Sequence, residues 1–123
     1  MPPHPAFGAL PVRFDDAAAD QAIAALEDLA TALRSYLQVD GQLQAPLRRD
    51  WRGPARTWFD GEHAATAQTV QQAINRAQTG AEELRRAKHL AATEQLHRNT
   101  EAEAAHRVEV ARLEALATPP PSP

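Results

Sequence analysis

The pentapeptide Asp50-Trp51-Arg52-Gly53-Pro54, near the middle of the chain, constrains the fold more than any other stretch. The residues on both sides have the composition and spacing of helices, whereas adjacent Gly and Pro interrupt a helix and mark a turn. Pro54 also suits an early position in the next helix, where its missing N–H removes no hydrogen bond. The chain is therefore predicted to be all-α, with two helices joined by a turn at residues 50–54.

The first helix is predicted over about residues 16–45. Asp15 or Asp16 can cap it, because a carboxylate accepts from the free N–H groups of a first turn and suits the helix dipole. Pro46 is expected to kink or end the helix, since proline cannot donate the next backbone hydrogen bond. Apolar side chains recur every three or four residues, the pattern of one buried helix face, at Ile23, Leu26, Leu29, Leu33 and Leu37.

The second helix is predicted over about residues 55–117. At about 1.5 Å per residue it would span on the order of 95 Å, so the shorter first helix can cover it only to roughly residue 90. The charged extension beyond contains four-residue ion pairs such as Glu94–Arg98. It is expected either to project as a fraying helix or to be covered by something outside the hairpin. The apolar residues of the second helix that recur at helical spacing include Trp58, Phe59, Val70, Ile74, Ala77, Ala81 and Leu84.

Both ends of the chain are rich in proline. Residues 1–14 are predicted to be an extended arm that can dock in part on the helices, and residues 118–123 a disordered tail, because proline excludes regular helix. The first residues lack the basic start and apolar run of a secretory signal. No stretch approaches the roughly 20 apolar residues of a membrane span. The chain is expected to be soluble and, if exported, to leave without a cleaved leader.

Composition restricts both the core and the class of partner. Hydrophobic residues make up 43% of the chain but aromatic residues only 5%, so much of the apolar fraction is alanine, which buries little area. We expect a second hairpin to complete this thin core as a four-helix bundle. A net charge of −3 argues against nucleic acid as the main partner. The predicted dimer face comprises Ile23, Leu26, Leu33, Leu37, Val70, Ile74 and Leu84.

No catalytic, cofactor or metal site is predicted, and the protein is not expected to be an enzyme. Glu94-x-x-His97 and Glu103-x-x-His106 have the spacing of di-iron carboxylate motifs. They are nine residues apart on one helix, and at about 100° per residue they face opposite sides. His63 is expected to lack a partner. The absence of cysteine excludes a thiolate zinc site, and neither Ser35 nor Ser122 lies in a nucleophile motif.

Charged and aromatic side chains gather around the turn. Arg48, Arg49, Arg52 and Arg56 are interpreted as solubilising charge at a hairpin end, with docking of an acidic partner as the alternative. Aromatic residues beside a turn usually close the end of a hairpin core, but a large cluster can also stay exposed as a contact site. Both roles are compatible here. The aromatic residues concerned are Trp51, Trp58 and Phe59.

Two alanine-rich amphipathic helices joined by Trp51-Arg52-Gly53, with Phe59 on the second helix, resemble the WXG-motif (ESAT-like) proteins of type VII secretion systems in actinobacteria and related bacteria. The resemblance covers roughly residues 16–94. It implies a helical hairpin that dimerises into an antiparallel four-helix bundle, with itself or with a sister protein, and is exported as a folded pair. Under this resemblance Trp51, Gly53, Trp58 and Phe59 form the turn and the partner contact.

The export signal of that family, Tyr-x-x-x-Asp/Glu, has a degenerate match here, with Leu90 in place of Tyr and Glu94 at the acidic position. The only tyrosine, Tyr36, lies on the first helix. Two explanations remain open: a partner supplies the signal, or the chain is a relative of the family with another role. The leading hypothesis is a non-enzymatic WXG-like secretion protein, cytoplasmic before export. The alternative is a cytoplasmic coiled-coil scaffold or adaptor, which accounts better for the long charged extension.

Overall fold

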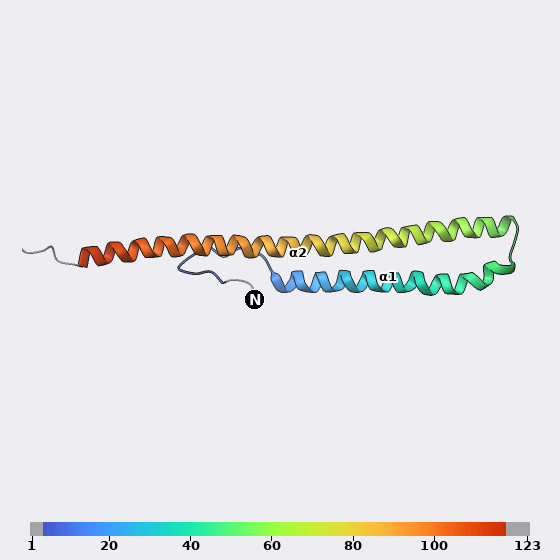
Figure 1. Ribbon diagram of the computed structural model, residues 1–123, viewed down its shortest axis with the longest axis horizontal. Helices are drawn as coiled ribbons and strands as arrows, with labels where there is room; N and C mark the ends of the chain where they lie inside the picture. The colour runs from blue at the N-terminus through green and yellow to red at the C-terminus, as the bar shows by residue number, and fades with distance from the viewer. Residues whose placement is uncertain (1–3, 118–123) are drawn as a thin grey trace, which may run out of the picture. The chain divides into compact units, whose positions relative to one another are not determined.

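The computed structural model describes residues 4–117, which form two helices and no strand (Figure 1). Helix α1 comprises Asp16–Asp50 and helix α2 comprises Pro54–Ala117. The predicted all-α hairpin with a long second helix is confirmed. Neither helix combines the length and apolarity needed to cross a bilayer. The predicted proline-rich tail, residues 118–123, lies outside the described residues.

Helix α1 continues past Pro46 to Asp50, five residues beyond the end predicted for it. Pro46 cannot donate a backbone hydrogen bond to the preceding turn, which normally weakens a helix at that point. The last turn is instead held by α2. The Arg56 guanidinium donates to the carbonyl of Arg48 at 2.7 Å, and the Arg48 guanidinium lies 3.0 Å from the Asp60 carboxylate. These tertiary contacts compensate for the missing backbone bond.

The described chain forms two compact units. The hairpin unit, Ala17–Arg85, consists of α1 and the first half of α2. The extension unit combines the N-terminal residues up to Asp16 with α2 from Arg86 onward. The extension predicted after about residue 90 therefore belongs to a unit of its own.

In the hairpin unit the helices run antiparallel. Leu26 lies opposite Gly80, Asp40 pairs with His63, and Arg48 pairs with Asp60. Residue numbers on α2 therefore fall as residue numbers on α1 rise, as expected for antiparallel helices. The buried apolar residues of the described chain are mostly alanine, and Ile74, at 1% exposure, is the only large side chain among them. The core comprises Ala19, Ala30, Ile74, Ala77 and Ala81, with Leu26, Leu33, Leu37 and Val70 partly buried against it.

In the extension unit, residues 4–15 form a non-helical arm that lies on α2. A tight turn reverses it, with the Ala9 N–H donating to the Ala6 carbonyl at 2.9 Å. The two central residues, Phe7 and Gly8, have φ of 48° and 79°, which is the signature of a type I′ turn. The arm contacts the extension through Gln95, Arg98 and Asn99. The arm covers part of the extension, around residues 95–99, whereas nearly every residue from 101 to 117 is exposed.

Candidate functional site

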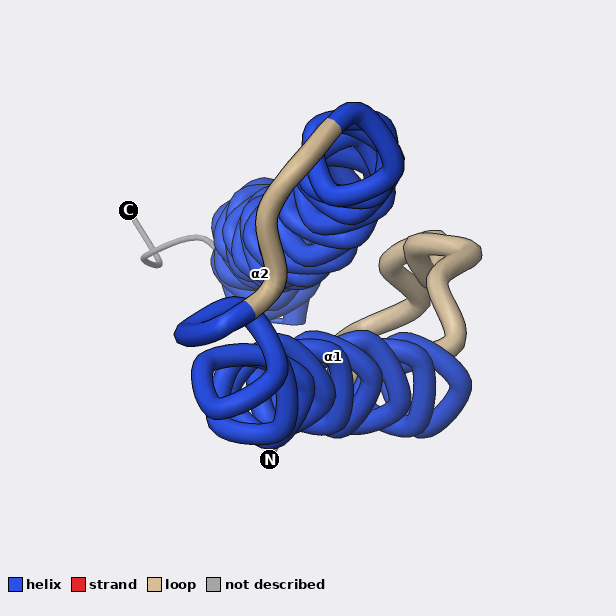
Figure 2. Tube along the Cα trace, turned by 90° about the vertical axis from the view of Figure 1, so that its right-hand side faces the viewer, coloured by secondary structure: helices blue, strands red, loops and turns tan. Residues whose placement is uncertain are grey.

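The turn between the helices depends on Gly53. Residues 51–53 cross from the end of α1 to the start of α2 (Figure 2). Gly53 has φ of 109°, a conformation that side-chain-bearing residues rarely adopt. Its carbonyl accepts from the backbone N–H groups of Arg56 and Thr57 at 3.1 and 3.2 Å and so starts the hydrogen-bond ladder of α2. A Cβ on Gly53 would meet nothing within 4 Å, so crowding does not explain the glycine. It is the backbone conformation that requires glycine here.

The aromatic residues of the turn play two different parts. Phe59 is half-buried, with its ring centroid 5.2 Å from that of Trp51 and 5.9 Å from that of His63. The Arg48 guanidinium carbon lies 5.9 Å from the centre of the Phe59 ring. Phe59 and Trp51 therefore close the end of the hairpin. Trp58, at 67% exposure, presents its ring to the surface.

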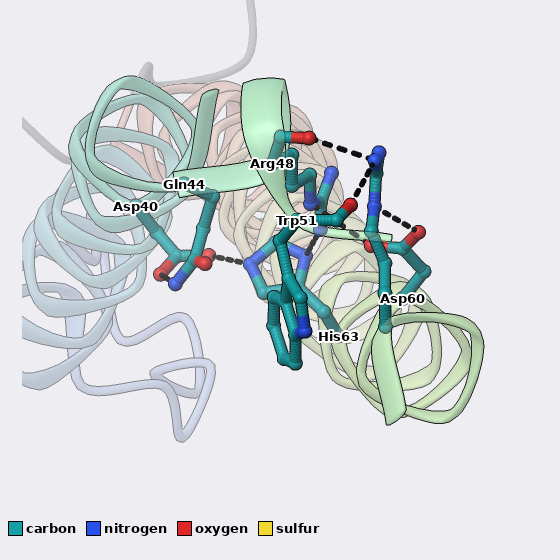
Figure 3. A network of polar contacts seen from close by, with 7 residues as sticks. Asp40, Gln44, Arg48, Trp51, Asp60 and His63 are labelled. Carbon is teal, nitrogen blue, oxygen red and sulfur yellow. Dashed lines mark hydrogen bonds and ion pairs between the residues drawn. The ribbon is translucent and has the colours of Figure 1, made fainter. Parts of the chain in front are cut away.

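Asp60, near the start of α2, lies beside Arg48 at the end of α1 (Figure 3). The Asp60 carboxylate lies 3.0 Å from the guanidinium of Arg48 and 3.2 Å from that of Arg56. Arg56 also donates to the carbonyls of Arg48 and Trp51, at 2.7 and 2.8 Å. Two members of the predicted basic cluster are therefore engaged inside the protein, while Arg49 and Arg52 remain exposed.

The expectation that His63 lacks a partner is wrong. The antiparallel register places His63 beside Asp40, 23 residues earlier, and these side chains are only 20% and 19% exposed. Arg48 donates to His63 Nδ1 at 2.9 Å, and a guanidinium has no lone pair with which to accept. Nδ1 is therefore the acceptor, and Nε2 carries the hydrogen that is donated to the Asp40 carboxylate. These contacts thus fix the orientation of the His63 ring between the two helices.

This polar network continues the two apolar stripes of the hairpin. On α1 the positions that follow Leu33 and Leu37 at three- and four-residue spacing are Asp40, Gln44 and Arg48. On α2 the residues that precede Val70 on the same face include Asp60 and His63 in the same way. Near the turn, hydrogen bonds and ion pairs therefore replace apolar packing between the helices. The sequence signal was available as a stripe that changes from leucine to polar residues without changing its period.

The residues of the predicted dimer face are used largely within the hairpin. Ile74 is fully buried, and Leu26, Leu33, Leu37 and Val70 pack partly buried around it. Ile23 and Leu84 are half-buried. These side chains offer a second chain only their remaining exposed edges.

A separate apolar stripe lies exposed on α1. Its members are spaced by seven and four residues, which places them within about 40° of one another around the helix. Sequence reasoning did not assign these residues to a contact face together. The exposed stripe comprises Leu29, Tyr36, Leu43 and Leu47, which are 48%, 49%, 64% and 63% exposed.

Shallow grooves on the hairpin unit differ in polarity. One, of about 330 Å³, is lined by Leu26 and Leu29 of α1 and by residues that include Ala73 and Ala77 of α2, so it adjoins the exposed stripe. Another, of about 440 Å³, is lined mainly by polar and charged side chains, which include Glu27, Thr31, Arg34, Gln78, Glu82 and Arg85. The hairpin therefore has an apolar side and a polar side.

The other predicted features lie in the extension unit. Leu90 is 59% exposed, and Glu94 forms the predicted ion pair with Arg98 at 3.1 Å. His97 pairs with Glu101 at 3.3 Å, whereas His106 stacks on Phe7. Within residues 4–117, no group of three His, Asp or Glu side chains is arranged to hold a metal ion.

Alanine substitution is expected to have opposite effects on the free energy of unfolding at the glycine of the turn and at a glycine inside α2. Gly53→Ala should lower the free energy of unfolding by about 1–3 kcal/mol, because its φ is unfavourable for alanine. Gly61→Ala, in α2 with open space around its Cβ, should raise it by about 0.5–1 kcal/mol. Denaturant unfolding followed by circular dichroism measures both changes. Equal effects at the two positions would contradict the role assigned to Gly53.

His63→Ala should destabilise the hairpin by about 1–3 kcal/mol, because it leaves the half-buried Asp40 carboxylate and an Arg48 N–H without their partner. His89→Ala is the matched control, since His89 is exposed on the same helix and its change should stay within about 0.5 kcal/mol. Urea unfolding of the two variants gives the comparison. Indistinguishable midpoints would mean that the contacts of His63 with Asp40 and Arg48 do not stabilise the hairpin.

Comparison with known proteins provides no family for this chain. No protein-family model, no curated protein and no solved structure matches its sequence or fold.

Proposed function

We propose that this protein is a non-enzymatic, WXG-like helical protein of a type VII secretion system, secreted as a dimer or acting as the partner of a secreted protein. The observation that carries the proposal is the geometry of Trp51-Arg52-Gly53. The tripeptide joins two antiparallel helices, Gly53 uses a conformation suited to glycine, and Trp51 packs on Phe59 of the next helix. Defined roles for the tryptophan and the glycine favour a motif over a chance tripeptide.

The thin core supports a second hairpin as the partner. Four of the five apolar residues buried within residues 4–117 are alanine, so two helices alone bury little of the area that stabilises a fold. The exposed stripe of α1 and the adjoining apolar groove provide the additional surface. A second hairpin laid on this side, from another copy or from a sister protein, would give a four-helix bundle. Trp58 of each hairpin then remains available to the partner or to the secretion machinery.

Sedimentation equilibrium with circular dichroism on the same sample tests the bundle. A stable helical dimer at micromolar concentration is expected if the chain completes its own bundle. A poorly folded monomer would indicate an obligate sister protein. A well-folded helical monomer with a cooperative unfolding transition would contradict the bundle.

Export is tested in a bacterium that encodes the protein, by detecting the chain in washed cells and in culture medium. Release into the medium should stop when the secretion ATPase is inactivated, with the chain then accumulating inside the cell at its full, uncleaved mass. A lysis marker controls for leakage. Release that is independent of the ATPase would contradict the proposal.

A cytoplasmic coiled-coil scaffold is the second candidate, and the charged end of α2 favours it. Nearly every residue from 101 to 117 is exposed, and ion pairs such as Arg107–Glu103, at 2.8 Å, line this surface. Such a helix is suited to bind other chains through its charged surface. Retention of the chain in the cell, unchanged by the ATPase, distinguishes this role.

A further inference from the structure

Two side-chain carboxamides on α2 hold the arm by its backbone in the same way. Asn99 donates through Nδ2 to the His4 carbonyl at 2.6 Å and accepts at Oδ1 from the Ala6 N–H at 3.1 Å. The residue between these two groups is Pro5, which has no N–H of its own. One carboxamide therefore brackets the tripeptide His4-Pro5-Ala6.

Gln95 repeats this arrangement one helical turn earlier. Its Oε1 accepts from the Val12 N–H at 2.7 Å, and its Nε2 lies 3.5 Å from the Leu10 carbonyl, so it brackets Leu10-Pro11-Val12. Nε2 also donates to Asn99 Oδ1 at 2.9 Å, which fixes the orientation of both carboxamides. Gln95 is 5% exposed, the only polar residue buried in the described part of the chain.

Arg98 lies between the two brackets in sequence and reinforces the second. Its Nη1 donates to the carbonyls of Leu10 and Pro11 at 3.4 and 3.2 Å. Glu94 holds the same guanidinium at 3.1 Å through Nε and so orients it toward the arm. The three side chains, within two turns of one helix, thus contact five backbone groups of the arm.

The contacts of α2 with the arm depend on backbone groups and on the spacing of the prolines more than on the arm's side chains. Leu10 remains 75% exposed although its carbonyl is held, and Phe7 remains 59% exposed although its ring stacks on His106 at 4.4 Å. Proline fixes φ in an extended conformation, which lowers the entropy lost when the two flanking groups are bracketed. The feature of the arm that these side chains recognise is therefore the pair of X-Pro-Y tripeptides, with their prolines six residues apart.

We propose that Gln95, Arg98 and Asn99 form a peptide-binding site for segments in which two X-Pro-Y tripeptides, with their prolines six residues apart, are joined by a tight turn, and that the arm is the site's own intramolecular occupant. This inference concerns α2 beyond Arg86 and does not depend on the proposed function. An arm tethered beside its site competes at an effective concentration of the order of millimolar. A peptide from another chain, a second copy of this arm included, therefore enters when the arm is released.

Amide hydrogen exchange measured by NMR on the full chain tests the brackets. Gln95→Leu should increase the exchange rate of the Val12 amide at least tenfold and affect Ala6 less, and Asn99→Leu should do the reverse. Thr100→Ala is the control, because Thr100 bonds only within α2, to the Leu96 carbonyl. Leucine is a good helix former, so α2 is expected to persist in both variants. Unchanged exchange at both arm amides would overturn the assignment.

Binding in trans is tested with the full chain carrying Ala6→Pro and Val12→Pro, which removes the two bracketed N–H donors and leaves α2 unaltered. A fluorescent peptide with the sequence of residues 4–14 should bind this variant at least tenfold more tightly than it binds the wild-type chain, where the arm occupies the site. Adding Gln95→Leu to the variant should weaken binding at least tenfold.

Two altered peptides control for specificity. The peptide carrying the same two substitutions should not bind, and the peptide with alanine for both prolines should bind several-fold more weakly. Failure of the wild-type peptide to bind the released variant would overturn the proposal. Equal affinity of the peptide for the wild-type chain and for the chain carrying Ala6→Pro and Val12→Pro would also overturn it. Binding that does not change when Gln95→Leu is added would do the same.

Discussion

Ile74→Asp is expected to unfold the hairpin. Ile74 is the one large side chain among the apolar residues buried in the described helices, and it packs with Ala30 and Ala77 in the core. The substitution removes an aliphatic side chain, worth about 2–5 kcal/mol in such sites, and buries a carboxylate that has no cation to pair with. Few small domains have stability enough to absorb both losses. Far-UV circular dichroism should show a large loss of helix and no cooperative thermal transition.

Asn75→Asp is the matched control, since it adds the same charge at the next position, where the side chain is exposed. The aspartate retains the oxygen that accepts from Gln71, so the helix content and the unfolding midpoint should remain near those of the wild type. An Ile74→Asp chain that unfolds at the wild-type midpoint would mean that the hairpin core lies elsewhere.

Tyr36→Glu combined with Leu43→Glu should dissolve the proposed dimer while leaving the hairpin folded. Both residues belong to the exposed stripe, at 49% and 64% exposure, so neither substitution buries a charge within the chain. In a two-hairpin bundle each copy would bring two carboxylates into the interface, and the dissociation constant should rise at least about 100-fold. Sedimentation equilibrium at tens of micromolar should give the monomer mass.

Thr31→Glu with Gln38→Glu provides the control on the other side of α1. The two positions have the same seven-residue spacing and are exposed, and Thr31 lines the polar groove. This variant adds the same charge and should remain dimeric. If the control variant dissociates while the Tyr36 and Leu43 variant stays a dimer, the interface lies on the polar side of α1.

The helices and the turn followed from local rules, because apolar spacing and the Gly53-Pro54 pair act within a few residues. The end of α1 did not, because Pro46 is tolerated only through contacts that Arg48 makes with α2. The partners of His63 were missed for the same reason, since Asp40 is 23 residues away in sequence. If the three- and four-residue spacing of the apolar stripes had been continued through the polar positions, it would have placed Asp40 and His63 between the helices.

The arm contacts had a weaker signal. Gln95 and Asn99 look like ordinary polar residues of a solvated helix, and nothing in their spacing alone indicates a ligand. The repeat of X-Pro-Y at Pro5 and Pro11 becomes meaningful only when the brackets on α2 are known. Backbone recognition by side chains depends on a three-dimensional register that composition and periodicity do not encode.

The alanine core has a consequence for how this sequence can vary. A Cβ on Gly80 would already lie 3.2 Å from the Leu26 Cδ1, and Ala30, Ala77 and Ala81 are nearly inaccessible. At these positions the penalty for substitution is one-sided, because there is little side chain to lose and no room to gain one. Neutral drift would therefore be confined to the smallest residues, and the hairpin could acquire a larger core only by several simultaneous changes that move the helices apart.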